Sequence, residues 1–211
     1  MANHNLFSDF EAISSKQWKQ QIQYELKGAD YNEILVWESP EGIKVKPLYH
    51  KDESEVNLNA ISNNIKLVKS KTQAEILAVV KADAYGHGLI PVAKCAVDAG
   101  ATWLGVALLE EAILLREAGI KAPIVSWLTP PSSDFKRAIE LDIDLAIPSL
   151  KHLELIVAAG KAVGKKPRVH IEVDTGMSRG GFLGEWSEFL IAATGAEIEV
   201  IGFWSHFARA D

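Results

Sequence analysis

The sequence predicts an α/β fold, an incomplete (β/α)8 barrel of the TIM type with about six parallel strands, preceded by a small helix-plus-hairpin leader. Apolar strand patterns alternate with helix patterns from residue 58 to residue 204. Regular alternation of this kind is typical of a parallel sheet with helices outside it. A closed barrel needs two more strand–helix units than the sequence supplies. The alternative is an open, curved sheet in which the leader hairpin shields one exposed edge.

The leader begins with a helix pattern. Ser14 and Gln17 have the spacing of a capping box. Trp18, Ile22 and Leu26 recur at every fourth position, and Gly28 is a natural stop. A hairpin is expected next, because residues 34–37 and 43–46 flank a Ser-Pro-Glu-Gly turn sequence at 39–42.

The second part alternates between the two kinds of element. The expected helices span about residues 58–69, 89–97, 109–118, 132–141, 150–163 and 185–194. The expected strands span about residues 76–81, 103–107, 123–127, 145–147, 169–173 and 199–204. In the last helix we expect Trp186, Phe189, Leu190 and Ala193 to point inward.

Composition bounds the functional class. The formal net charge is -6, which argues against nucleic acid or an anionic membrane surface as a partner. No apolar run approaches the length of a membrane span. The single cysteine excludes an internal disulfide and fits a reducing compartment. The N-terminus lacks the basic region and apolar stretch of a secretion signal, so a cytoplasmic location is expected.

The most informative stretch is the run from Val80 to Leu89, which follows the apolar residues 76–79. Lys81 therefore ends what is expected to be a buried strand. Poor solvation there favours the neutral, nucleophilic amine. Such an amine suits an imine with a carbonyl compound, of which pyridoxal phosphate is the commonest cofactor. The alternative is a lysine that reaches past the strand end into water.

Three segments resemble motifs of the alanine racemase family, in the family's order. They are Lys81–Gly88, Val173–Arg179 and Ser205–Asp211. The resemblance covers about residues 55–211 and implies a barrel that binds pyridoxal 5'-phosphate and acts on alanine. The third motif corresponds to the end of the sixth strand, so the resemblance implies a barrel truncated there.

The resemblance also implies site roles. Lys81 is the imine-forming lysine and removes the substrate α-proton on one face. Tyr85 bonds the cofactor phosphate, Arg179 bonds the phenolic oxygen, and Trp127 flanks the cofactor. His206 lies near the cofactor ring. Purely structural alternatives stay open for four of these residues. They are a core tyrosine for Tyr85, a surface ion pair for Arg179, a core tryptophan for Trp127 and a hydrogen-bonded strand-end histidine for His206. No metal site is assigned.

Three further expectations concern residues in or beside the second and first motifs. Many racemases have a carbamylated lysine at the position of Glu172, which holds the arginine, and a carboxylate at Glu172 is expected to serve directly. Asp174 to Gly176 are expected to form the turn that aims Arg179. His87 is expected to bond local backbone rather than to catalyse.

Residues of about 6–49 resemble a different family, the N-terminal stretch of methylmalonyl-CoA mutase subunits. The matching segments are Leu26–Tyr31, Leu35–Trp37 and Glu41–Tyr49. The chain is therefore interpreted as a chimera, with a leader at 1–52 and a partial barrel at 53–211. An ordinary N-terminal extension that packs on the barrel through Trp18 and Trp37 is compatible with this.

The predicted function is that of a fragment of a pyridoxal phosphate-dependent racemase interconverting L- and D-alanine. Racemisation needs a base on each face of the carbanion. The family's second base is a tyrosine from the β domain of a partner subunit, so we expect the chain alone to be inactive. A homo-oligomer or a complementing chain is the expected partner. The alternatives are a non-racemising pyridoxal phosphate-binding protein and an assembly module of a mutase complex.

Overall fold

The computed structural model describes residues 13–40, 44–47 and 56–209. The chain divides into two compact units, Met1–Val56 and Asn57–Asp211. Each unit is described by itself.

The first unit contains helix α1 (Ser15–Glu25) and helix α2 (Tyr31–Leu35). The capping box predicted at the start of α1 is confirmed. The Gln17 backbone N–H donates to Ser14 Oγ at 3.3 Å, and the Ser14 N–H donates to Gln17 Oε1 at 2.9 Å. The two helices meet where the ring of Trp18 stands edge-on to the ring of Tyr31, with centroids 6.2 Å apart.

The predicted hairpin is present, but it is shorter and begins later than expected. Strand β1 (Trp37–Glu38) pairs antiparallel with β2 (Lys44–Val45). The expected strand at 34–37 is wrong at its first two residues, because Asp30 caps a helix that runs through them. The Asp30 carboxylate accepts the N–H groups of Asn32 and Glu33 at 2.8 and 3.2 Å. The second half of the predicted turn, residues 41–42, lies outside the described residues.

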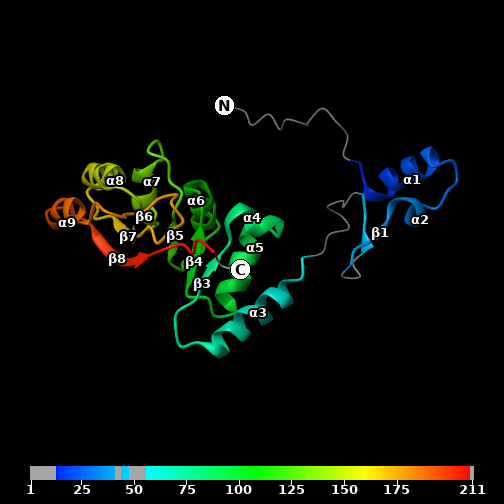
Figure 1. Ribbon diagram of the computed structural model, residues 1–211, viewed down its shortest axis with the longest axis horizontal. Helices are drawn as coiled ribbons and strands as arrows, with labels where there is room; N and C mark the ends of the chain where they lie inside the picture. The colour runs from blue at the N-terminus through cyan, green and yellow to red at the C-terminus, as the bar shows by residue number, and fades with distance from the viewer. Residues whose placement is uncertain (1–12, 41–43, 48–55, 210–211) are drawn as a thin grey trace. The chain divides into compact units, whose positions relative to one another are not determined.

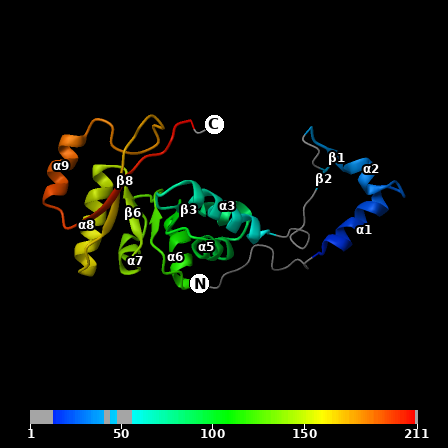
Figure 2. The same cartoon turned by 90° about the horizontal axis from the view of Figure 1, so that it is seen from below.

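The second unit is built on a six-stranded parallel sheet in the chain order β3-β4-β5-β6-β7-β8. Figure 1 shows the strands side by side, and Figure 2 shows the same arrangement from below. The strands are β3 (Leu77–Val79), β4 (Trp103–Val106), β5 (Ile124–Ser126), β6 (Asp144–Ile147), β7 (Arg168–Glu172) and β8 (Glu199–Trp204). The helices are α3 (Leu58–Lys71), α4 (Lys81–Gly86), α5 (Leu89–Asp98), α6 (Leu109–Glu117), α7 (Phe135–Glu140), α8 (Leu150–Val163) and α9 (Trp186–Thr194).

The core lies between one face of this sheet and the helices. Successive strand side chains point to opposite faces, so alternate residues of each strand enter this layer. Leu104, Ile124, Leu145 and Ile171 from four of the strands are completely buried there. The other residues of the strands face the concave side of the sheet, where the functional residues collect.

Three sequence-based expectations need correction. Strand β3 ends at Val79, so Lys81 begins the next segment rather than ending the strand. The strand is not buried either: it lies at the sheet edge, and Leu77 and Val79 are 40% and 41% exposed. Leu190 is 58% exposed, because α9 covers the far end of the sheet and its packing against the core uses Phe189.

Within the described ranges, no helix combines the length and the apolar character that a membrane crossing requires.

Candidate functional site

A cavity of about 250 Å³ lies on the concave side of the sheet, near the carboxyl ends of its strands. Its wall includes Lys81, Tyr85, Trp127 and His206, four of the five residues predicted for the site. The other lining residues are Leu77, Val79, Val125, His170, Trp204 and Ser205. The two edge strands β3 and β8 contribute to one cavity, and the chain after β8 runs back toward β3 (Figure 1).

Lys81 and Tyr85 enter the cavity from an unusual backbone segment. Residues Ala82 to Tyr85 all have left-handed helical dihedral angles, with φ between 52° and 57°. This reversed turn places the Lys81 Nζ atom 6.0 Å from the centroid of the Tyr85 ring. The sequence patterns predict no left-handed turn here, because non-glycine residues rarely adopt this conformation in succession.

His87 closes the turn. Its Nδ1 atom lies 2.8 Å from the Ala84 carbonyl oxygen, and its backbone N–H donates to the same oxygen at 3.1 Å. A carbonyl oxygen only accepts, so Nδ1 carries the proton. The predicted structural role of this histidine is therefore confirmed.

Two tryptophans form the aromatic wall. The rings of Trp127 and Trp204 are tilted against each other with centroids 5.9 Å apart. A Cβ atom at Gly105 would lie 2.6 Å from Cζ3 of Trp127 and 2.5 Å from Cδ2 of Leu77. The absence of a side chain at Gly105 on β4 thus leaves room for the Trp127 ring to reach across toward β3.

Trp204 carries the site's orphan polar atom. Its indole Nε1–H is buried and has no hydrogen-bond partner among the described residues. A buried donor without a partner is costly, so it points to an acceptor supplied from outside the chain. Sequence reasoning missed this residue. The alternation along β8 was the available signal, since it places Trp204 on the same face as its register partner Glu172.

The strand-end loops are tied together at the cavity mouth. Thr175 and Ser205 bring their hydroxyl oxygens to 2.5 Å. The turn predicted after β7 is confirmed, because Asp174 Oδ1 accepts the N–H groups of Gly176 and Ser178 at 2.9 and 3.0 Å. These hydrogen bonds lower the pKa of the Asp174 carboxyl, and the one from Ser178 contributes most.

Arg179 is the one predicted site residue that does not line the cavity. It lies exposed in the loop after β7. Its charge acts on Glu172, which is 5% exposed. Burial raises the pKa of Glu172, the positive charge of Arg179 opposes that shift, and the charge of Asp174 adds to it. No hydrogen bond or ion pair reaches the Glu172 carboxylate from any described residue.

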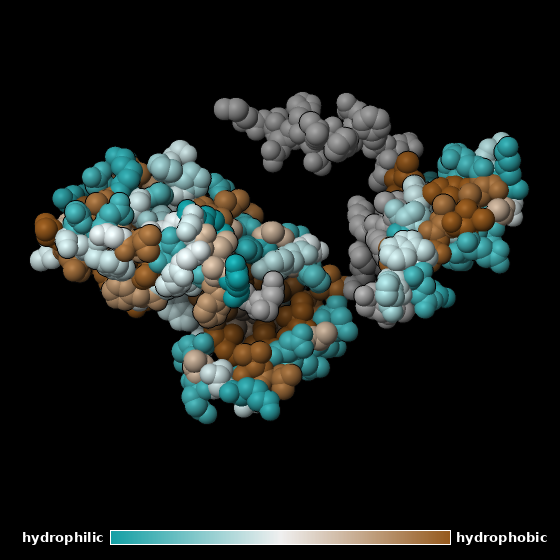
Figure 3. All heavy atoms as spheres, viewed as in Figure 1, coloured by the Kyte–Doolittle hydropathy of each residue, from teal (hydrophilic) through white to brown (hydrophobic). Residues whose placement is uncertain are grey.

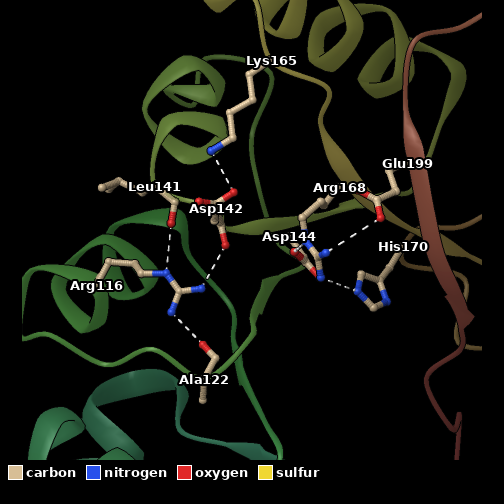
Figure 4. Close-up of polar contacts among 9 residues, drawn as sticks. All are labelled: Arg116, Ala122, Leu141, Asp142, Asp144, Lys165, Arg168, His170 and Glu199. Carbon is tan, nitrogen blue, oxygen red and sulfur yellow. Dashed lines mark hydrogen bonds and ion pairs between the residues drawn. The ribbon is translucent and has the colours of Figure 1, made fainter.

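Deeper along the same face, His170 contacts both the cavity and a buried ion pair (Figure 4). Its Nε2 atom lies 3.1 Å from Oδ2 of Asp144, and its ring stands edge-on to Trp103. Arg168 donates from Nε to Oδ1 of Asp144 at 2.7 Å. Burial raises the pKa of Asp144, but the hydrogen bonds from His170 and Arg168 more than offset this, and the net pKa is lowered.

Comparison with known proteins gives a consistent match. A family model described as "Alanine racemase, N-terminal domain" matches residues 56–211. An alanine racemase of Salinispora tropica is 46% identical over 164 residues, which cover 75% of this chain and 44% of that protein. One of Beutenbergia cavernae is 49% identical over 162 residues, covering 74% and 43% respectively. The chain thus spans less than half the length of these relatives.

Solved structures agree. The alanine racemase from Streptomyces coelicolor A3(2) superposes with a TM-score of 0.72 at 40% identity, covering 74% of this chain and 44% of that one. The enzyme from Streptomyces lavendulae gives a TM-score of 0.71 at 39% identity, covering 74% and 42%.

Proposed function

Since the chain belongs to the family of alanine racemase N-terminal domains, we propose that it forms the pyridoxal phosphate-binding part of a racemase acting on alanine. The observation that supports this most is the cavity: Lys81, Tyr85, Trp127 and His206, which are distant in sequence, line one hollow. In barrels of this type the chemistry is done at the carboxyl ends of the strands, where these residues lie.

The residues present fit the cofactor. A flat heteroaromatic ring suits a cavity with aromatic and aliphatic walls and few polar groups. The buried Nε1–H of Trp204 offers a donor that only an external acceptor can satisfy. Lys81 is half-buried and lines the same wall, so its amine is within the space that such a ring occupies.

Lys81 holds the cofactor covalently in this proposal. Its Nζ is the atom that would hold the aldehyde carbon of the cofactor. Tyr85 contributes its hydroxyl to the phosphate and Arg179 its guanidinium to the phenolic oxygen. The bound cofactor supplies an electron sink for the α-carbon of alanine. The Lys81 Nζ, once released by the amino group of the substrate, would accept the α-proton on one face of the substrate.

Inversion requires a proton delivered to the opposite face. We propose that this second acid–base group is a tyrosine contributed by a partner subunit, so that a homo-oligomer or a complementing chain completes the activity. A cytoplasmic location follows for the same proposal, and the single cysteine supports it.

Glu172 has a positioning role in this site. Its carboxylate is buried behind the loop that holds Arg179, and the two opposite charges attract. A carboxylate is an anion of the same shape as a carbamate. Glu172 is therefore proposed to hold Arg179 toward the cofactor without carbon dioxide.

The test adds pyridoxal phosphate to the purified chain, reduces the adduct with borohydride and maps it by peptide mass spectrometry. The wild type should be labelled at Lys81, and Lys81→Arg should lose the label while keeping its melting temperature. Lys121→Ala removes an exposed lysine outside the cavity and is the matched control. Labelling spread over surface lysines, with Lys81→Arg unaffected, would refute the proposal.

The resemblance of residues 6–49 to mutase subunits stays a prediction. The family match begins at residue 56 and gives this resemblance no support. Co-purification of the intact chain with a mutase subunit, lost on deletion of residues 1–52, would establish it.

A further inference from the structure

The segment that presents Lys81 is strained. Left-handed helical geometry costs an L-residue roughly 1–2 kcal/mol, and Asp tolerates it better than Ala or Tyr. Ala82, Asp83, Ala84 and Tyr85 adopt it in succession. Such a conformation persists only where the surroundings determine it more strongly than the local preference does. The contacts that hold this turn therefore decide where Lys81 points.

Part of the restraint is apolar and lies at the two ends of the turn. Val80 and Leu89, which flank it, are buried, and Ala84 is 4% exposed. Val80 is fixed to the neighbouring strand, because its N–H donates to the Gly105 carbonyl at 2.9 Å. At the far end, the Asp83 carboxylate accepts the Leu89 N–H at 2.7 Å.

The residue next to Lys81 is held by a side chain far away in sequence. Glu111 Oε1 accepts the Ala82 backbone N–H at 2.6 Å. Its other oxygen, Oε2, accepts the N–H groups of Ala107 and Leu108, each at 3.0 Å. One carboxylate thus joins the turn after β3 to the loop after β4.

Glu111 is itself rigidly placed. It lies in the first turn of α6, and the neighbouring Leu109, Ala112 and Leu115 bury that helix in the core. A charged acceptor with three N–H donors is also stronger than a neutral one. The hydrogen bond from the Ala82 N–H to Glu111, called the Ala82 anchor below, is therefore a fixed point next to which the Lys81 side chain extends.

We propose that Glu111 is a positioning residue for Lys81: its carboxylate fixes the Ala82 N–H, and this sets the direction in which the Lys81 amine enters the cavity. The proposal rests on the proposed function, since it concerns the lysine that binds the cofactor. The alternative role, a cap for α6 alone, uses only the bonds to Ala107 and Leu108.

Glu111→Gln separates the two roles. The amide has one oxygen, so it keeps either the two loop bonds or the single Ala82 bond. Keeping two bonds is favoured, and the amide NH₂ then faces the Ala82 N–H, donor against donor. The variant therefore retains the α6 cap and loses the anchor.

The experiment measures the dissociation constant for pyridoxal phosphate from the absorption of the lysine adduct. Glu111→Gln should weaken binding about tenfold or more, the loss expected for one hydrogen bond to a charged group. Glu110→Gln is the control, because Glu110 lies on the same helical turn and is exposed. Asp134→Ala removes the N-cap bond to the Arg137 N–H in α7. It should lower the melting temperature without changing the dissociation constant.

Equal dissociation constants for Glu111→Gln and Glu110→Gln would overturn the proposal, even if Glu111→Gln melts earlier. Absence of any adduct in the wild type refutes the proposed function instead. The anchor is then judged by exchange of the Ala82 amide, which should be faster in Glu111→Gln than in Glu110→Gln. If Glu111→Gln does not fold, the wild-type Ala82 amide decides: slow exchange supports the anchor and free exchange refutes it.

Discussion

Two buried carboxylates lie on neighbouring strands of the same sheet, and their surroundings shift their pKa values in opposite directions. Asp144 begins β6 and is held by Arg168 and His170, so its pKa is lowered despite burial. Glu172 ends β7, and burial outweighs the opposing charge of Arg179, so its pKa is raised. At the amino ends of the strands, the buried Asp144 carboxylate has hydrogen-bond partners. At the carboxyl ends, the buried Glu172 carboxylate has none among the described residues.

Other groups at the two ends of the strands show the same difference in hydrogen bonding. At the amino ends of the strands, Arg116 donates to the carbonyl oxygens of Leu141, Ala122 and Asp142 (Figure 4) and also to that of Ile120. At the carboxyl ends stand an indole N–H without a partner among the described residues and a left-handed turn. Figure 3 shows apolar surface around α3 and β3, where Leu77 and Val79 are exposed. The first end is built for stability, and in the proposed function the second is completed by a ligand.

We expect the largest effect on stability from removing the hydrogen bonds of Arg116 at the amino ends of the strands. Arg116→Ala leaves several backbone carbonyls without donors at the junction of α6, β5 and β6, and each buried unsatisfied group costs about 1–3 kcal/mol. We expect a loss of about 3 kcal/mol or more in the free energy of unfolding by urea titration. Arg116→Lys should recover only part of it, because one ammonium cannot reach all four carbonyls. The division of roles fails if the folded Arg116→Ala protein also loses pyridoxal phosphate affinity.

The second effect sharpens the contrast through pH. The folded pKa of Asp144 lies below its ordinary value of 3.8, so its stabilisation is present above that pH and is lost as the pH falls through the folded pKa. Asp144→Asn should lower the free energy of unfolding by about 2–3 kcal/mol at pH 7. The difference from the wild type should shrink below about pH 4. A difference that is constant from pH 3 to pH 7 would contradict the assignment.

Glu172 should behave with the opposite sign. Its folded pKa lies above the ordinary value of 4.5, so the folded state loses stability as the pH rises from 4.5 through the folded pKa. Glu172→Gln removes this loss and should be more stable than the wild type at neutral pH. It should also bind pyridoxal phosphate about tenfold more weakly, because Arg179 loses its counter-charge. Glu188→Gln, an exposed change on α9, is the control. An unchanged dissociation constant for Glu172→Gln would show that Arg179 is positioned otherwise.

Sequence patterns predicted the well-packed part of the molecule best. Helix α8 has its expected bounds, and all six strands were placed, because apolar periodicity reports burial against the helices. The patterns failed where local preference is overridden. Of residues 82–85 only Asp83 tolerates left-handed geometry well, and Glu111, which anchors the turn, lies 29 positions from Ala82. Lys81, Tyr85 and His206 were found through motifs and Trp127 through the wider resemblance, whereas the unpartnered N–H of Trp204 is visible only in three dimensions.

The smallest expected effect tests whether charge alone, without burial, makes the amino end of the sheet stable. Lys165 Nζ lies 2.7 Å from Oδ1 of Asp142, beside the Arg116 network (Figure 4), but both side chains are largely solvated, at 39% and 64% exposed. Exposed ion pairs are screened by water and salt, so Lys165→Ala should change the free energy of unfolding by about 0.5 kcal/mol or less. The Arg116 and Asp144 variants should exceed it severalfold under the same conditions, because their partners lose hydrogen bonds in places that water reaches poorly. If Lys165→Ala destabilises as much as Asp144→Asn, net charge at this end matters more than buried pairing, and the contrast between Asp144 and Glu172 needs another cause.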